Sequence, residues 1–318
     1  MKEIIKVNRF TLTIFLISII GSFFYSDILR LFNLNDDIYY RILIPQLGFL
    51  LLPILIFLII NNKNLKALLR IKPITLYEII SIIGFSLFIL PVGWFINLLS
   101  QLFATNHIEG TLVNLTEIPF FIAILLIAVL PSITEEILCR GILYNSYRKF
   151  GILKATLLSS LIFGMIHMNI NQFLYAIVLG FIFVLLVEVT DSIFSSILAH
   201  FVINTIPVLL LRALSNIELT ELAETTELTG NVEVISGIII TFILLLFTAP
   251  IALFIFYGLA KYNDRLNHIK SIFNPKIKSE VDAPEITTFS KEKNKIVTIH
   301  IYICIFIFAS LSILIEFL

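Results

Sequence analysis

The sequence predicts an all-α protein, a polytopic bundle of about eight to nine transmembrane helices. Hydrophobic residues make up 58% of its 318 residues and charged residues only 14%, whereas a soluble domain carries about 25% charged residues. The apolar residues also fall into runs close to the roughly 20 residues that a helix needs to cross a bilayer. One soluble core could not bury this much apolar surface, so we expect the lipid bilayer to be its main solvent.

Nine apolar runs are candidate spans, with ends defined only to within several residues. The predicted spans are 8–25, 42–61, 76–100, 118–134, 153–167, 173–189, 193–211, 233–258 and 297–317. The fifth and sixth are the weakest, because they are short or separated by only a few polar residues.

The basic residues alternate between the predicted loops. Cytoplasmic loops of membrane proteins are rich in lysine and arginine. Nineteen of the 22 basic residues lie in four segments on one predicted side, at 1–9, 61–72, 140–154 and 261–295. We therefore expect a multi-pass protein of the cell membrane with a cytoplasmic N-terminus and a polar cytoplasmic loop at 261–295. The formal net charge of zero and the lack of a basic patch argue against a nucleic-acid partner.

The stretch TEEILCR places two glutamates and an arginine at the predicted cytoplasmic end of the fourth span. Glu136 and Arg140 are four residues apart and share a helix face, whereas Glu135 points about 100° away. Arg140 would then orient Glu136 and balance its charge, while Glu135 faces elsewhere. An ordinary interfacial charge cluster is the alternative, because charges cost less where a helix meets the headgroups.

Two histidines in later apolar segments each have a partner four residues away. Phe163 and His167 share a face of the fifth span, and His200 and Asn204 lie inside the seventh. Polar groups inside a span need partners, although packing or hydrogen bonding between helices could explain each pair alone. The remaining histidines lack such company and are expected to be structural: His107, His268 and His300.

Taken together, EExxxR, FxxxH and HxxxN, in this order on successive helices, resemble the motifs of the CPBP family. These are the CAAX-protease and bacteriocin-processing intramembrane proteases, also called the Abi family and related to the Rce1-type prenyl endopeptidases. All three motifs are present without substitution. The resemblance implies a catalytic core at 118–211, preceded by three spans in 1–117 and followed by C-terminal helices in 212–318.

The residues and the resemblance point to the same chemistry. A carboxylate in a poorly hydrated cavity is a stronger base near neutral pH, so we expect Glu135 to activate a water molecule with the help of His167. His200 and Asn204 would donate hydrogen bonds to the tetrahedral intermediate. The predicted boundaries place Glu135 and His167 at opposite ends of their spans, so shifted boundaries, or a tilted or re-entrant fifth segment, must bring them together.

A metal cofactor stays open at this point. Glu135, His167 and His200 match the ligand types of a catalytic zinc site, and the family is often described as metalloproteases. The HExxH motif is absent, however, and the same groups can act without a divalent metal. We favour the metal-free alternative.

The sequence therefore predicts an intramembrane endopeptidase that cuts a peptide or a (prenylated) protein. Its composition, rich in Ile, Asn and Lys, indicates an AT-rich bacterium, where the resemblance suggests bacteriocin immunity or peptide and pheromone processing. The alternative is a non-proteolytic scaffold or regulator that keeps the fold and binds a membrane-protein partner. A transporter is less well supported, because we find no internal repeat.

Overall fold

The computed structural model describes residues 2–61, 64–106, 118–214, 230–274, 276–277 and 296–317, and the regular structure of this part of the chain is entirely helical. Eight of its helices are long and apolar enough to cross a membrane. The predicted all-α, multi-pass architecture is confirmed. His107 lies outside the described residues, as does most of the predicted loop at 261–295.

Six of the eight candidate spans are single helices: α1 (Lys2–Phe23), α6 (Leu76–Ser100), α12 (Ile170–Thr190), α13 (Ile193–Leu214), α15 (Gly230–Tyr262) and α17 (Ile299–Phe317). Four shorter helices lie between them: α2 (Tyr25–Leu31), α5 (Leu65–Leu68), α11 (Ile152–Met165) and α16 (Leu266–Phe273). The amphipathic α16 falls inside the predicted polar loop and buries Ile269 and Ile272.

The other two candidate spans are continuous helices that change their winding. The first comprises α3 (Ile38–Leu43), the π-helical η1 (Ile44–Leu51) and α4 (Leu52–Asn61). The second comprises α8 (Phe120–Ile124), η2 (Leu125–Val129), α9 (Leu130–Glu136), η3 (Ile137–Tyr144), α10 (Asn145–Tyr147) and η4 (Arg148–Phe150), with η2 and η3 π-helical. Such π-helical turns often occur at functional sites.

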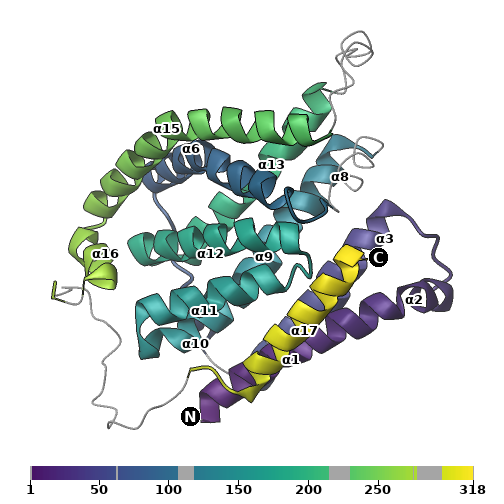
Figure 1. Cartoon of the computed structure of the whole chain (residues 1–318). Helices are drawn as coiled ribbons and strands as arrows, with labels where there is room; N and C mark the ends of the chain where they lie inside the picture. The colour runs from purple at the N-terminus through teal and green to yellow at the C-terminus, as the bar shows by residue number, and fades with distance from the viewer. Residues whose placement is uncertain are drawn as a thin grey trace.

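The helices form three groups in space (Figure 1). α9, α11, α12 and α13 occupy the centre, α6 and α15 pack along each other on one side, and α1 and α17 lie together on another. α12 and α13 also both pack on α6. The central helices therefore lie between two outer pairs, and a hydrophobic cluster with members from all three groups joins them.

Two predicted boundaries are wrong, and the corrections are related. The fourth span does not end near residue 134, because the helix continues over Phe120–Phe150 and Glu135 lies at its middle. The fifth predicted span is the helix α11, which has only 14 residues and a length of about 21 Å at 1.5 Å per residue. A bilayer core is about 30 Å thick, so α11 ends partway across.

Because α11 is short, Glu135 and His167 need not lie at opposite ends of the bundle, as the predicted boundaries implied. Glu135 precedes the start of α11 at Ile152 by 17 residues, and His167 follows it by 15. With the chain reversing near Gly151, both side chains lie a similar distance from that turn. The sequence pattern missed this because the apolar run of the fourth helix is interrupted by Glu135, Glu136 and Arg140, which lie inside the protein.

Glu188, close to the C-terminal end of α12, is a buried carboxylate with many donors. It accepts hydrogen bonds from Tyr144 at 2.8 Å, from Nε and Nη2 of Arg148 at 2.9 Å, and from Arg70. Nε2 of His268 lies 2.6 Å from Oε2 of Glu188. His268, expected to be structural, thus joins α16 to the central helices. We call these five residues the Glu188 cluster.

Charged contacts bring all four basic segments to the same end of the bundle. Besides the Glu188 cluster, Lys149 pairs with Glu3 at 2.6 Å, and Arg265 lies 3.5 Å from Asp191. Loops on one side of a membrane would meet in this way. That this side is the cytoplasmic one stays a prediction.

Candidate active site

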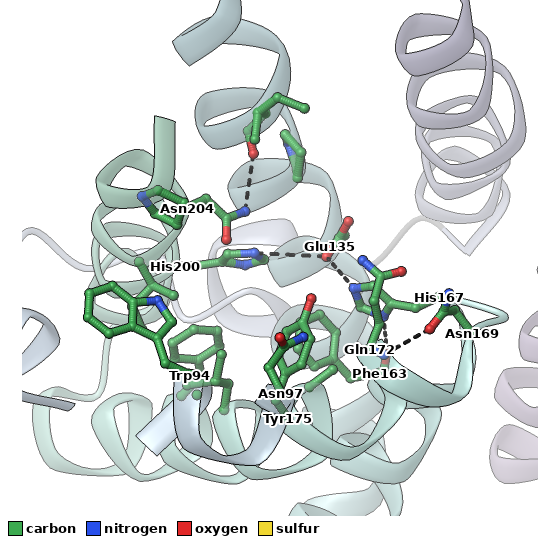
Figure 2. A pocket seen from close by; sticks show the side chains of 18 of the residues that line it. Trp94, Asn97, Glu135, Phe163, His167, Asn169, Gln172, Tyr175, His200 and Asn204 are labelled. Carbon is green, nitrogen blue, oxygen red and sulfur yellow. Dashed lines mark hydrogen bonds and ion pairs between the residues drawn. The ribbon is translucent and has the colours of Figure 1, made fainter. Parts of the chain in front are cut away.

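The three motifs meet around Glu135 in the middle of the bundle. Oε2 of Glu135, from α9, lies 4.0 Å from Nε2 of His167, which follows α11, and 3.9 Å from Nε2 of His200 on α13. Figure 2 shows the carboxylate between the two imidazoles. The carboxylate and both rings therefore face one point, although neither nitrogen is within direct hydrogen-bonding distance of Oε2.

Phe163 explains the FxxxH motif. Its carbonyl oxygen lies 2.8 Å from Nδ1 of His167, and a carbonyl can only accept, so Nδ1 carries the proton. Nε2 of a neutral His167 therefore presents its lone pair towards Glu135. The Phe163 ring also meets both His167 and His200 edge-on, with ring centroids 5.2 and 5.8 Å apart, which restricts the rotation of both imidazoles.

Glu136 and Arg140 form an ion pair beside Nδ1 of His200, the ring nitrogen that does not face Glu135. Oε1 of Glu136 lies 3.0 Å from Nδ1 of His200 and accepts a hydrogen bond from Nη1 of Arg140 at 2.8 Å. Arg140 also donates to the carbonyl of Gly180 at 3.0 Å and lies 4.3 Å from the centroid of the Phe163 ring. Both charged side chains are almost fully buried. This ion pair fixes the imidazole so that Nε2 faces Glu135.

Gly180 allows this close approach. A Cβ atom at this position would lie 3.2 Å from Nη2 of Arg140 and 3.1 Å from Phe163. A side chain here would push the guanidinium away from the carbonyl that it binds. No sequence motif indicates this role, because the residues directly on either side of Gly180 in α12 are apolar.

Asn204 lies one turn beyond His200 on α13. Its Nδ2 donates to the carbonyl of Ile127 at 3.1 Å. Ile127 belongs to the π-helical η2. This contact uses one amide hydrogen and leaves the second available.

A cavity of about 730 Å³ is lined by Glu135, His167, His200 and Asn204, among other residues. Glu135 is the one Asp, Glu, Lys or Arg side chain among the described residues that border it. Much of the wall is apolar or aromatic: Leu90, Trp94, Ile127, Pro131, Phe163, Tyr175, Leu179, Phe183, Ile203, Pro207 and Ile315. Side-chain amides supply most of the other polar groups: Gln46, Asn97, Asn106, Asn169, Gln172 and Asn204.

Trp94, Asn97 and Tyr175 lie across the cavity from Asn204 (Figure 2). None of these three residues belongs to a sequence motif, and neither does Gln46, whose Nε2 donates to Oε1 of Glu135 at 3.1 Å. Gln46 and Trp94 lie far from the motifs in sequence, so only the fold reveals their place. Cys139, an intervening residue of the first motif, is fully buried within the core.

The metal hypothesis can be tested against the donor geometry. Zinc bonds of about 2.0–2.2 Å in a tetrahedral site place neighbouring donor atoms roughly 3.4 Å apart. The separations of Oε2 of Glu135 from Nε2 of His167 and of His200 are 4.0 and 3.9 Å, and no group of three His, Cys, Asp or Glu side chains in the described ranges is arranged to hold a metal ion. The residues as placed do not fit a metal, so we derive no step through one.

Comparison with known proteins points to the same part of the chain. Residues 117–206 match the family model described as Type II CAAX prenyl endopeptidase Rce1-like. Over 142 residues the chain is 30% identical to the Bacillus subtilis (strain 168) protein named "Putative membrane peptidase YdiL". That match covers 40% of this chain and 57% of the relative, so the chain spans little more than half of that protein. No solved structure matches the chain. The matched segment contains all three motifs, and the predicted resemblance is confirmed.

Proposed function

We propose that the chain is an intramembrane endopeptidase that hydrolyses a peptide bond with a glutamate-activated water, because residues 117–206 match the family model described as Type II CAAX prenyl endopeptidase Rce1-like. The observation that carries this proposal is the convergence of Glu135, His167 and His200 on one point in the cavity wall. Two groups 3.9–4.0 Å apart can both reach one water at ordinary hydrogen-bond lengths of about 2.8 Å.

Glu135 is the general base in this mechanism. The water donates one hydrogen to Oε2 of Glu135 and the other to the lone pair on Nε2 of His167, and its oxygen attacks the carbonyl carbon of the scissile bond. Glu135 then passes the proton to the leaving amine as the C–N bond breaks. General acid–base catalysis of this kind contributes roughly 10²–10⁴-fold to a rate.

His200 and Asn204 stabilise the negative oxygen of the tetrahedral intermediate. Asn204 donates through its second amide hydrogen, since the first is bonded to Ile127. His200 can donate from Nε2 only when both ring nitrogens carry protons, because Nδ1 faces Glu136. The Glu136–Arg140 pair orients this imidazole and balances its charge.

The cavity wall defines a class of substrate. Its surface is mainly apolar, and Glu135 is its one charged side chain among the described residues. A charged substrate side chain in this cavity would lose its hydration and find no charged partner in the described part of the wall except Glu135, which the proposed mechanism uses as the base. We therefore propose that the cleaved segment carries apolar or uncharged side chains, and that the amides of the wall bind its backbone. A prenylated protein and an unmodified peptide both satisfy this requirement. The proposed biological role is peptide maturation or bacteriocin immunity.

Peptide termini in bacterial membranes test the proposal. Membranes with the wild-type protein should contain termini that are lost with Glu135→Gln, which keeps the shape of the side chain but cannot take up the proton. Glu78→Gln is the matched control, because Glu78 is also buried but closes the N-terminal capping box of α6, where glutamine serves as well. Identical termini in the wild type and Glu135→Gln would overturn the proposal.

Complementation separates this function from a scaffold or regulator. Alanine at Glu135 or His167 should abolish the cellular phenotype at a normal protein level, whereas full rescue would favour the non-proteolytic alternative. The same cleavage assay with a chelator addresses the metal. We expect activity to survive, and a loss that zinc restores would contradict the metal-free mechanism.

A further inference from the structure

Gln46 lies outside the family-matched segment but contacts the proposed general base. It belongs to η1 in the second candidate span, 89 residues before Glu135. Its Nε2 donates to Oε1 of Glu135 at 3.1 Å, and its Oε1 lies 2.7 Å from the hydroxyl of Thr134. We propose that Gln46 is a positioning residue that decides which oxygen of Glu135 acts as the base. This inference rests on the proposed function.

Donor and acceptor chemistry fixes the orientation of the Gln46 amide. An ionised Glu135 can only accept hydrogen bonds, so Gln46 must turn its NH₂ group towards it. The amide oxygen then faces Thr134, whose hydroxyl lies 2.7 Å from it and can donate to it, although the carbonyl of Leu130 at 3.0 Å is a second acceptor. The reversed amide would place two acceptors 3.1 Å apart. Thr134 is almost fully buried, which holds this pair in place.

The contact makes the two oxygens of Glu135 unequal. Oε1 receives the amide hydrogen of Gln46, whereas Oε2 faces His167 and His200. A proton taken from the attacking water is therefore accommodated at Oε2, on the side of the substrate. Without Gln46 the carboxylate could rotate about its last bond and turn away from the two imidazoles.

The local backbone explains how a residue of this helix reaches the site. Pro45 lies at the start of η1 and has no N–H to donate, and the wider π-helical turn follows directly. η1 packs on α9 and also on α1, so the first two spans hold Gln46 against the central helices. The N-terminal region thereby supplies a side chain to the site, which the motifs alone do not predict.

Replacing Gln46 tests the proposal, with fluorescence-quenched peptides of uncharged residues as substrate and purified full-length protein in detergent. Gln46→Met keeps the length of the side chain but removes the donor. We expect kcat to fall roughly 10- to 100-fold, the usual effect of removing an orienting partner, with KM and the melting temperature nearly unchanged. Asn61→Leu is the control on the same candidate span, because Asn61 lies outside the cavity wall and donates to the carbonyl of Phe57 in its own helix.

Gln46→Glu gives a signature that a purely structural role would not produce. When the introduced carboxyl group is protonated it donates to Glu135 as the amide does, and when it is ionised the two carboxylates repel each other. Activity should therefore recover as the pH is lowered, relative to the wild type. If Gln46→Met does not fold, the pH profile of Gln46→Glu tests the proposal instead. A profile parallel to that of the wild type overturns the proposal.

Failure of this inference can be told apart from failure of the proposed function. If Glu135→Gln is inactive while Gln46→Met keeps the wild-type kcat, only the positioning role is wrong. If Glu135→Gln is as active as the wild type, the glutamate mechanism itself is wrong.

Discussion

Two buried carboxylate sites lie at different depths in this bundle, and they differ in how their oxygens are used. In the Glu188 cluster, Glu188 accepts hydrogen bonds from Arg70, Tyr144 and Arg148 and contacts His268, so both of its oxygens have partners. In the cavity, Glu135 has one hydrogen bond from the part of the chain that the structure describes, donated by Gln46, and its second oxygen faces two imidazoles beyond bonding distance.

This difference fits a structural role for Glu188 and the reactive role that we propose for Glu135. A buried carboxylate whose lone pairs are all occupied holds helices together and has no capacity left for a substrate. Around Glu135 that capacity remains, and in the same site Oε2 of Glu136 and Nε of Arg140 are buried without a hydrogen-bond partner among the described residues. Such incomplete pairing is costly and persists where a site needs it for function.

The largest expected effect on stability lies in the Glu188 cluster. Glu188→Gln removes the charge that Arg70 and Arg148 neutralise, and breaking a buried ion pair costs about 3–5 kcal/mol. Thermal unfolding in detergent should show a clear loss of stability. Glu135→Gln, the same substitution in the cavity, should leave the melting temperature close to that of the wild type. Equal melting temperatures for both variants would remove the distinction between the two sites.

The next effect concerns rate rather than stability. Asn204→Ala removes the amide that would stabilise the oxyanion, and kcat should fall roughly 10²–10³-fold, the usual cost of removing one such donor. Thr205→Val is the control on the same helix, because within the described ranges the Thr205 hydroxyl bonds only to the carbonyl of Phe201 in its own helix. Wild-type turnover by Asn204→Ala would exclude Asn204 from the oxyanion site.

The smallest effect depends on pH and lies at the edge of the Glu188 cluster. Burial alone would raise the pKa of Asp191, but Arg70, Lys72 and Arg265 outweigh it and hold the pKa below its usual value of 3.8. The stability from this charge is therefore present above about pH 4 and is lost as the pH falls through the folded-state pKa.

Asp191→Asn tests this dependence. Asparagine tolerates the left-handed backbone of this residue, where φ is 56°. We expect a loss of about 1–3 kcal/mol at neutral pH, the size of a hydrogen bond to a charged group. The difference from the wild type should shrink below pH 4 in a series of thermal melts. A constant difference at every pH would show that the charge of Asp191 contributes nothing.

Composition and residue spacing were enough to predict the solvent, the fold class and the residue types of the candidate site. Apolar runs of bilayer length can only be helical, because the backbone has no water to bond in lipid. The i, i+4 spacings placed Glu136 with Arg140 and Phe163 with His167, and both pairs are in contact through local helix geometry alone.

The tertiary structure alone decided which of these pairs share a cavity and what else joins them. Apolar periodicity does not show where a helix ends when charged residues face protein rather than lipid, so the depths of Glu135 and His167 were predicted wrongly. Contacts between residues far apart in sequence, such as Gln46 with Glu135 and Arg140 with Gly180, leave no local pattern. They arise from packing between helices, whose register is fixed only when the side chains of the whole bundle fit together.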